Sequence, residues 1–309
     1  MEILNALLIR FPVSGVETNL LLPPLVAFAV SFLTSMGGVS GAFILLPFQV
    51  SVLGYTAPSV SATNQVFNIV AIPSGVWRYI KEKRMVWPLT WAVIIGTLPG
   101  VFIGAWVRIE YLPDPKHFKF FAGFVLLYIG IRLFPDILKT KKGTAPASAK
   151  SGAGLPAEFV VTQTRFSLHR VEFHFAGEPY SFPTMGVFLL CFLVGIAGGI
   201  YGIGGGAIVA PFFVAFFKLP VYTIAGAALM GTFVTSVAGV IFYHILAVFY
   251  PAQSIAPDWY LGALFGIGGF AGMYAGARCQ KYVPAHIIKM ILCACVLFVA
   301  GKYIIGFFA

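Results

Sequence analysis

The hydrophobic pattern of this chain consists of long apolar stretches separated by short polar loops. Six stretches are close to the roughly 20 residues that cross a bilayer as a helix. They cover residues 59–77, 88–107, 117–134, 221–247, 259–277 and 286–308. The pattern predicts an all-α polytopic membrane protein with three membrane-spanning helices in each half.

An apolar segment interrupted by glycines precedes each group of three helices. These segments run from about residue 21 to 54 and from 185 to 217. As one straight helix each would be roughly 50 Å long, which exceeds the ~30 Å of the hydrocarbon core. We therefore expect each segment to fold back at its glycines into a re-entrant helical hairpin, with arms of about 12 to 15 residues, too short to cross comfortably.

The two glycine clusters lie at equivalent positions of an internal repeat. Residues 36–47 read MGGVSGAFILLP and residues 200–211 read IYGIGGGAIVAP, 164 residues further on. The loop at 78–88 holds four Lys or Arg residues, whereas its counterpart at 248–258 holds none. Because basic loops stay in the cytoplasm, the halves have opposite orientations. The sequence predicts two inverted repeats, residues 1–134 and 184–309.

Both repeats also carry glycines at every fourth position of one helix. The two ladders are Gly96, Gly100 and Gly104, and Gly268, Gly272 and Gly276. Small residues at this spacing form a smooth face that lets another helix approach closely. We expect these glycines to serve helix packing.

The linker at residues 135–183 differs in character from both repeats, and its basic residues make it cytoplasmic by the same rule. Residues 139–155 are rich in Lys, Gly, Ala and Ser, which is typical of a flexible segment. From 158 to 175, apolar Val171, Phe173 and Phe175 alternate with Glu172 and His174. This period of two predicts a small β-hairpin.

Composition excludes an ordinary soluble protein, because 59% of the residues are hydrophobic, 10% are charged and the mean hydropathy is +0.92. The formal charge of +10 does not indicate nucleic-acid binding, since the basic residues lie in short loops beside apolar stretches. Four cysteines lack CxxC spacing, so we expect no metal and no cofactor. A multi-pass protein of the inner (plasma) membrane follows.

The hairpin tips are the candidate substrate site. If each hairpin turns at its glycines, the second arms begin near Gly41 and Gly205 and point their N-termini at the bilayer middle. Unpaired N–H groups and the helix dipole favour an anion there. The candidate contacts at the tips are Gly38, Ser40, Gly41, Gly204, Gly205 and Gly206. The alternative is that these glycines only permit a tight kink or close packing.

Polar residues on the next helix of each repeat extend this candidate site. The first half offers Thr63, Asn64 and Asn68, and the last two share a helix face at positions i and i+4. The second half offers Thr232, which matches Asn68 in the repeat, and Thr235. Amide and hydroxyl donors bind oxyanions, although hydrogen bonds between helices explain such residues about as often.

Four further residues are candidates for vestibule or gating roles: Arg78, Tyr79, Tyr243 and His244. His244 suits either pH gating or a structural role. Arg78, which could also attract anions, and Arg108 lie at helix ends, where we expect them to snorkel to the interface. No Asp or Glu lies in the middle of a predicted membrane helix, so the coupling ion, a proton or sodium, stays open.

At these residues the chain resembles the TauE/SafE family of sulfite and organosulfonate exporters. The likeness rests on GIGGGAIVAP at 202–211, on GGVSGAFILLP at 37–47 and on ATNQVFN at 62–68. Ser40 departs from the usual GIGGG pattern. The resemblance implies transport of small sulfur oxyanions or sulfonates, such as sulfite or sulfoacetate, across the inner membrane. We expect the anion to bind near the midplane between the hairpin tips, where rocking of the repeats alternates its access.

Two other classes of function stay open at the sequence level. An anion channel would use the same architecture without saturation or coupling. A membrane-embedded enzyme would need a nucleophile, a metal cluster or an acid/base pair within the membrane, and the chain contains neither HExxH nor GxSxG. We therefore expect a transporter and not an enzyme.

Overall fold

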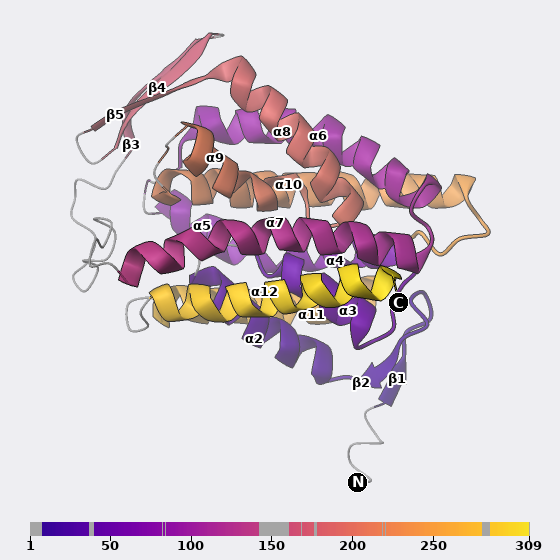
Figure 1. The fold of residues 1–309 in the computed structure, drawn as a ribbon. Helices are drawn as coiled ribbons and strands as arrows, with labels where there is room; N and C mark the ends of the chain where they lie inside the picture. The colour runs from indigo at the N-terminus through magenta and orange to yellow at the C-terminus, as the bar shows by residue number, and fades with distance from the viewer. Residues whose placement is uncertain are drawn as a thin grey trace.

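A computed structural model describes residues 8–36, 40–81, 83, 85–141, 161–167, 169–175, 178–217, 219, 221–279 and 285–308. The described part is a bundle of helices that lie side by side (Figure 1). A three-stranded sheet lies at one end of the bundle, which we call the sheet end. A short β-hairpin near the N-terminus lies at the opposite end, which we call the distal end.

Helices form over all six predicted membrane stretches. In the first half they are α2 (Leu22–Met36), α3 (Ala42–Ser51), α4 (Ser59–Ala71), α5 (Pro73–Lys81), α6 (Trp87–Glu110) and α7 (Pro115–Lys141). In the second half they are α8 (Thr184–Tyr201), the 3-10 turn η2 (Gly205–Ile208), α9 (Val209–Phe217), α10 (Val221–Phe249), α11 (Trp259–Cys279) and α12 (Ala285–Phe308). The first stretch divides into α4 and α5 before Pro73, which has no N–H to continue the helical bonds.

Three helices of the described residues are long and apolar enough to cross a membrane: Trp87–Glu110, Thr184–Tyr201 and Thr223–Phe249. The second of these, α8, has 18 residues, so the expected upper limit of about 15 residues for a hairpin arm was wrong there. The helix continues through Gly195 and Gly199, because both pack tightly against α6. It ends at Gly202, which has a φ of +76°.

The glycine ladders are helix-packing faces, as predicted. A Cβ atom added at Gly100 or Gly104 of α6 would lie 2.3 Å from a backbone oxygen of α8. A Cβ atom added at Gly272 or Gly276 of α11 would lie 2.3 Å from a backbone oxygen of α2. Each ladder thus packs against the first hairpin arm of the other half of the chain.

The linker holds a three-stranded antiparallel sheet in the order β3 (Val161–Phe166), β4 (Arg170–Phe175), β5 (Glu178–Pro183). In β4, Val171, Phe173 and Phe175 are buried and Glu172 is exposed, which confirms the predicted alternation. The prediction missed β5. It also ended the preceding helix at residue 134, whereas α7 runs to residue 141. Most of the segment predicted to be flexible lies outside the described residues.

The distal end carries a small hairpin of β1 (Leu8–Arg10) and β2 (Glu17–Asn19), which the sequence did not predict because each strand has only three residues. Its turn is anchored where Ser14 donates to Asp258 Oδ2 through its backbone N–H at 3.1 Å and its hydroxyl at 2.8 Å. Asp258 immediately precedes α11, so the hairpin is fixed to the start of that helix.

Candidate functional site

Asn64 on α4 links the interrupted regions of both hairpins. Its side-chain Nδ2 donates to the carbonyl of Ala42 at 3.1 Å and to that of Gly202 at 3.0 Å. Its Oδ1 accepts from Gln49 Nε2 at 3.2 Å. Ala42 starts α3 and Gly202 follows the last residue of α8. One buried amide therefore holds together two breaks that lie 160 positions apart in the chain.

Asn68, one turn further along α4, makes a second link. Its Nδ2 donates to Ile203 O at 3.0 Å and to Ser236 Oγ at 3.2 Å, and its Oδ1 accepts from Ser40 Oγ at 3.1 Å. Both N–H groups of each asparagine are thus donated to protein acceptors. We call the site formed by Ser40, Asn64, Asn68, residues 202–206 and Ser236 the tip junction.

The glycines of the second break are needed for conformation and for space. Gly202 and Gly204 have φ of +76° and +83°, in the left-handed region that side chains disfavour. A Cβ atom at Gly206 would lie 2.2 Å from Ala228 O on α10, and one at Gly202 would lie 2.4 Å from Ser61 Cβ. These contacts show that the glycines of this cluster serve a kink and close packing, and a ligand role for them is a separate proposal.

Two threonines of α10 complete the junction. The Gly205 N–H donates to Thr235 Oγ1 at 3.1 Å, so a hydroxyl caps one of the N–H groups that the break exposes. Thr232 donates to Ala228 O of its own helix at 2.8 Å, while its side chain packs against Gly204. Both predicted threonines therefore lie beside the break.

The remaining tip residues behave differently. Gly38 lies outside the described residues. Gly41 packs against α2, where an added Cβ would lie 3.0 Å from Ser31 Oγ. The hydroxyl of Thr63 is hydrogen-bonded to Tyr55 OH at 3.0 Å and accepts the Asp258 N–H at 2.9 Å. Thr63 therefore anchors distal loops and is not brought to the tip junction.

The candidate gating residues are spread over both ends of the bundle. Arg78 and Tyr79 are half-buried on α5, towards the sheet end, and Tyr79 packs beside Gly226 of α10. Tyr243 is fully buried on the distal half of α10. His244 is exposed, on the same helix face as the exposed Ile241 and Val248. His244 therefore points away from the tip junction.

Arg108 does not snorkel, and this expectation was wrong. The side chain is fully buried. Its guanidinium lies 3.9 Å from the centroid of the Phe118 ring and donates to the carbonyls of Leu112 and Thr56. The reason is tertiary, since the start of α7 folds over the end of α6. The position of a residue at a helix end does not indicate whether the next helix will bury its side chain.

Gln49 was also missed as part of the network around Asn64. It is fully buried on α3, and its Nε2 supports the Asn64 carbonyl oxygen. A single amide in the otherwise apolar run AFILLPFQVS was the signal that could have identified it.

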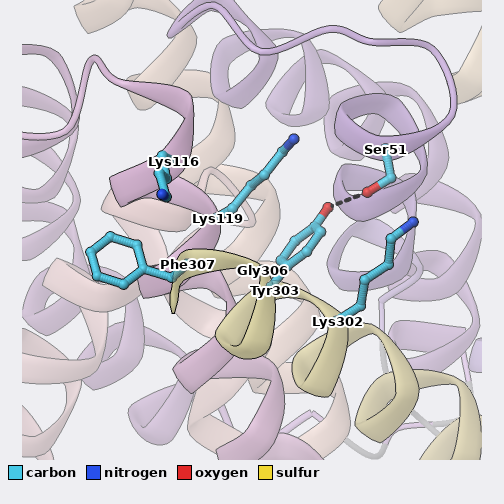
Figure 2. Close-up of a pocket in the computed structure, with 7 residues that line it drawn as sticks. All are labelled: Ser51, Lys116, Lys119, Lys302, Tyr303, Gly306 and Phe307. Carbon is cyan, nitrogen blue, oxygen red and sulfur yellow. Dashed lines mark hydrogen bonds between the residues drawn. The ribbon is translucent and has the colours of Figure 1, made fainter. Parts of the chain in front are cut away.

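An open cavity of about 220 Å³ lies at the distal end and is lined by Ser51, Lys116, Lys119, Lys302, Tyr303, Gly306 and Phe307. Figure 2 shows Lys119 and Lys302 on either side of the hydrogen-bonded Ser51 and Tyr303, and Lys116 beside Phe307. Tyr303 also donates to Pro47 O at 3.3 Å, so α12 is fastened to α3 at this place. No carboxylate is among these lining residues. We call this cavity the lysine pocket.

Comparison with known proteins identifies the chain's relatives. The family model described as "Sulfite exporter TauE/SafE" matches residues 24–303. The probable membrane transporter protein YunE of Bacillus subtilis (strain 168) is 25% identical over 268 residues, which cover 84% of this chain and 87% of that protein. No solved structure matches the chain. Since the matched region includes both interrupted hairpins and nearly all of the helical bundle, the chain belongs to the TauE/SafE sulfite exporter family, a family of membrane transporters.

Proposed function

We propose that this protein is a secondary transporter of small sulfur oxyanions, such as sulfite or sulfoacetate, across the inner (plasma) membrane. The observation that carries the proposal is the tip junction, where two interrupted hairpins meet and two amides of α4 hold both. Discontinuous membrane helices that meet in this way are typical of transporter substrate sites. Family membership supports a transporter, and the chemistry of the junction supports an anion.

The tip junction suits an anion because it offers donors and the starts of helices. No Asp or Glu belongs to the residues that define it, and its hydroxyl and amide groups can all donate. The starts of α3 and of η2 and α9 bring the positive ends of their dipoles to the same place. The proposed contacts are Gly38, Ser40, Gly41, Asn64, Asn68, Gly204, Gly205, Gly206, Thr232 and Thr235.

The described conformation is closed at the junction, because the amide N–H groups are donated to protein carbonyls and hydroxyls. An entering oxyanion exchanges these neutral hydrogen bonds for charge-assisted ones, which are roughly twice as strong. Asn64 and Asn68 therefore act first as a latch and then as ligands.

Alternating access follows if the halves are inverted repeats that move against each other. The support is reciprocal packing, since α6 of the first half contacts α8 while α11 of the second contacts α2. Basic residues Lys81, Arg165 and Arg278 lie on elements that reach the sheet end, and by the positive-inside rule they support a cytoplasmic position for that end.

Flux of labelled sulfite and sulfoacetate into proteoliposomes tests the function. We expect saturable uptake that unlabelled sulfite inhibits by competition. Taurine should not inhibit it, because the taurine ammonium group disfavours binding to a purely anion-selective site. Asn68→Leu combined with Gly205→Leu should abolish uptake. Gly301→Ala is the matched control, since nothing lies within 4 Å of the added Cβ. Absence of flux for both anions, or flux unchanged in the double variant, contradicts the proposal.

A further inference from the structure

Four fully buried side chains on α4, α6 and α10, beside the tip junction, have polar atoms without a hydrogen-bond partner of normal geometry. These atoms are Ser61 Oγ, Gln65 Nε2 and Oε1, Arg108 Nε and Tyr243 OH. Buried polar atoms are nearly always hydrogen-bonded, and an exception calls for an explanation such as a bound ion. We call these four side chains the distal polar cluster.

Pairwise contacts connect the four side chains across three helices. Ser61 and Gln65 lie one turn apart on α4. Gly239 of α10 packs against Gln65, since a Cβ there would lie 2.3 Å from Gln65 Oε1. One turn further along α10, the Tyr243 hydroxyl lies beside Ser61 and within electrostatic range of Arg108.

Packing supports this arrangement independently. Tyr243 belongs to a small buried apolar cluster with Ala62, Ala105 and Ile109. Ala62 is next to Ser61, while Ala105 and Ile109 flank Arg108 along α6. The distal polar cluster is therefore one site at the contact of α4, α6 and α10.

Arg108 gives this site a positive charge that no carboxylate of the described residues neutralises. Its hydrogen bonds go to two carbonyls, which are neutral, and its ring contact is with Phe118. An arginine keeps its charge in proteins, and burying a charge without a counter-ion is costly. An anion at the cluster would supply both the missing charge and the missing acceptors.

We infer that the distal polar cluster is a second anion-binding station, where Ser61, Gln65, Tyr243 and Arg108 donate to the oxygen atoms of a sulfite- or sulfonate-type group. All four side chains carry a donor, and Arg108 disfavours a cation. This inference rests on the proposed function and adds to it a second site on the route.

The position of the cluster fits a route to the distal end. Ser61 precedes Asn64 and Asn68 of the tip junction by three and seven residues on α4, which corresponds to about 5 and 10 Å along the helix axis. The backbone of Gly202 lies against Ser61, so the cluster adjoins the tip junction. An anion released from the junction towards the distal end reaches these donors next.

Thermal shift of the purified protein with sulfite and with sulfate tests the inference. Tyr243→Phe and Ser61→Ala each remove one of two neighbouring hydroxyls, neither of which forms a hydrogen bond of normal geometry in the protein. We therefore expect a melting temperature without anion within about 2 °C of wild type, which corresponds to less than about 1 kcal/mol. The apparent Kd for the anion should rise about tenfold, as expected when a hydrogen bond to a charged group is lost.

Tyr201→Phe is the matched control, because the buried Tyr201 hydroxyl donates to Phe43 O at 3.0 Å. It should lower the melting temperature without anion and leave the anion-dependent shift in place. Arg108→Lys adds a further test, since it keeps the charge and loses the unpartnered Nε. This variant should weaken anion binding. Its melting temperature without anion is compared with that of the wild-type protein as the control for folding.

Parallel flux measurements separate the inference from the proposed function. A shift that Tyr243→Phe and Ser61→Ala reduce, in a protein without sulfite or sulfoacetate flux, supports the station and contradicts the transport proposal. If the apparent Kd for the anion in both variants equals that of the wild-type protein, the second anion-binding station is contradicted, even if flux is normal. Absence of any anion-dependent shift in wild type overturns the station as well.

Discussion

The tip junction and the distal polar cluster are both buried, both polar and both built on α4 and α10, yet they differ in how their polar atoms are satisfied. At the junction, the side-chain atoms of Asn64 and Asn68 are all hydrogen-bonded to the protein. At the cluster, the polar atoms named above have no partner. Partnered groups stabilise the architecture, whereas unpartnered donors are available to a ligand. Substitutions should therefore separate stability from affinity.

Asn68→Leu should give the greatest loss of stability. It leaves Ile203 O, Ser40 Oγ and Ser236 Oγ without this partner. At about 1 to 3 kcal/mol for each unsatisfied buried group, the total loss is on the order of 3 kcal/mol or more. Thermal melting in detergent measures it, with Ser61→Ala on the same helix as the control. Equal melting temperatures for the two variants would show that partnering does not distinguish the two sites.

Gly206→Ala and Gly301→Ala should shift stability in opposite directions. A Cβ at Gly206 would lie 2.2 Å from Ala228 O, so α10 must move, at a cost of about 1 to 3 kcal/mol. Nothing lies within 4 Å of a Cβ at Gly301, inside α12. Alanine there gains about 0.5 to 1 kcal/mol of helix stability. Melting curves of both variants check this, and a stable Gly206→Ala protein contradicts the close approach at the break.

The lysine pocket should affect rates and hardly affect stability. Replacing Lys119 and Lys302 by Gln removes two of its positive charges. We expect anion flux to fall by about two- to threefold at low ionic strength and to match wild type at high salt, because surface electrostatics are screened. Lys81→Gln on α5 is the control for charge alone. A reduction that persists at high salt would mean that the lysines contact the anion directly.

Substitution of Asp114 should change stability the least, because its carboxylate is hydrogen-bonded but exposed to solvent. Hydrogen bonds from the backbone N–H groups of His117 and Lys116 lower the pKa of its carboxyl. A carboxyl whose folded pKa is lowered stabilises the fold above its unfolded pKa of about 3.9, and the contribution is lost as the pH falls through the lower folded pKa.

Asp114→Asn should therefore melt slightly below wild type at pH 7, and the difference should shrink below about pH 4 and disappear once the pH falls below the lowered folded pKa. A difference that grows on acidification contradicts this assignment. The comparison also tests burial, since the same kind of hydrogen bond is worth little at the surface.

The sequence predicted the helices and their interruptions well, because apolar length and glycine placement are local signals. The alternation in β4 was equally readable. The partners of Asn64 and Asn68 were not predictable, since they include carbonyls of residues 202 and 203, more than 130 positions away. The burial of Arg108 likewise depends on Phe118 from the next helix. Which amides hold backbone and which donors stay unpartnered is decided by packing between distant segments.

Counterflow in proteoliposomes tests the central claim most directly. Vesicles loaded with unlabelled sulfite are diluted into a trace of labelled sulfite, and internal label is followed over time. Alternating access at a saturable site predicts that label rises transiently above its equilibrium level and then decays. Label that only approaches equilibrium, at a rate linear in sulfite concentration, would identify a channel and contradict the transporter account.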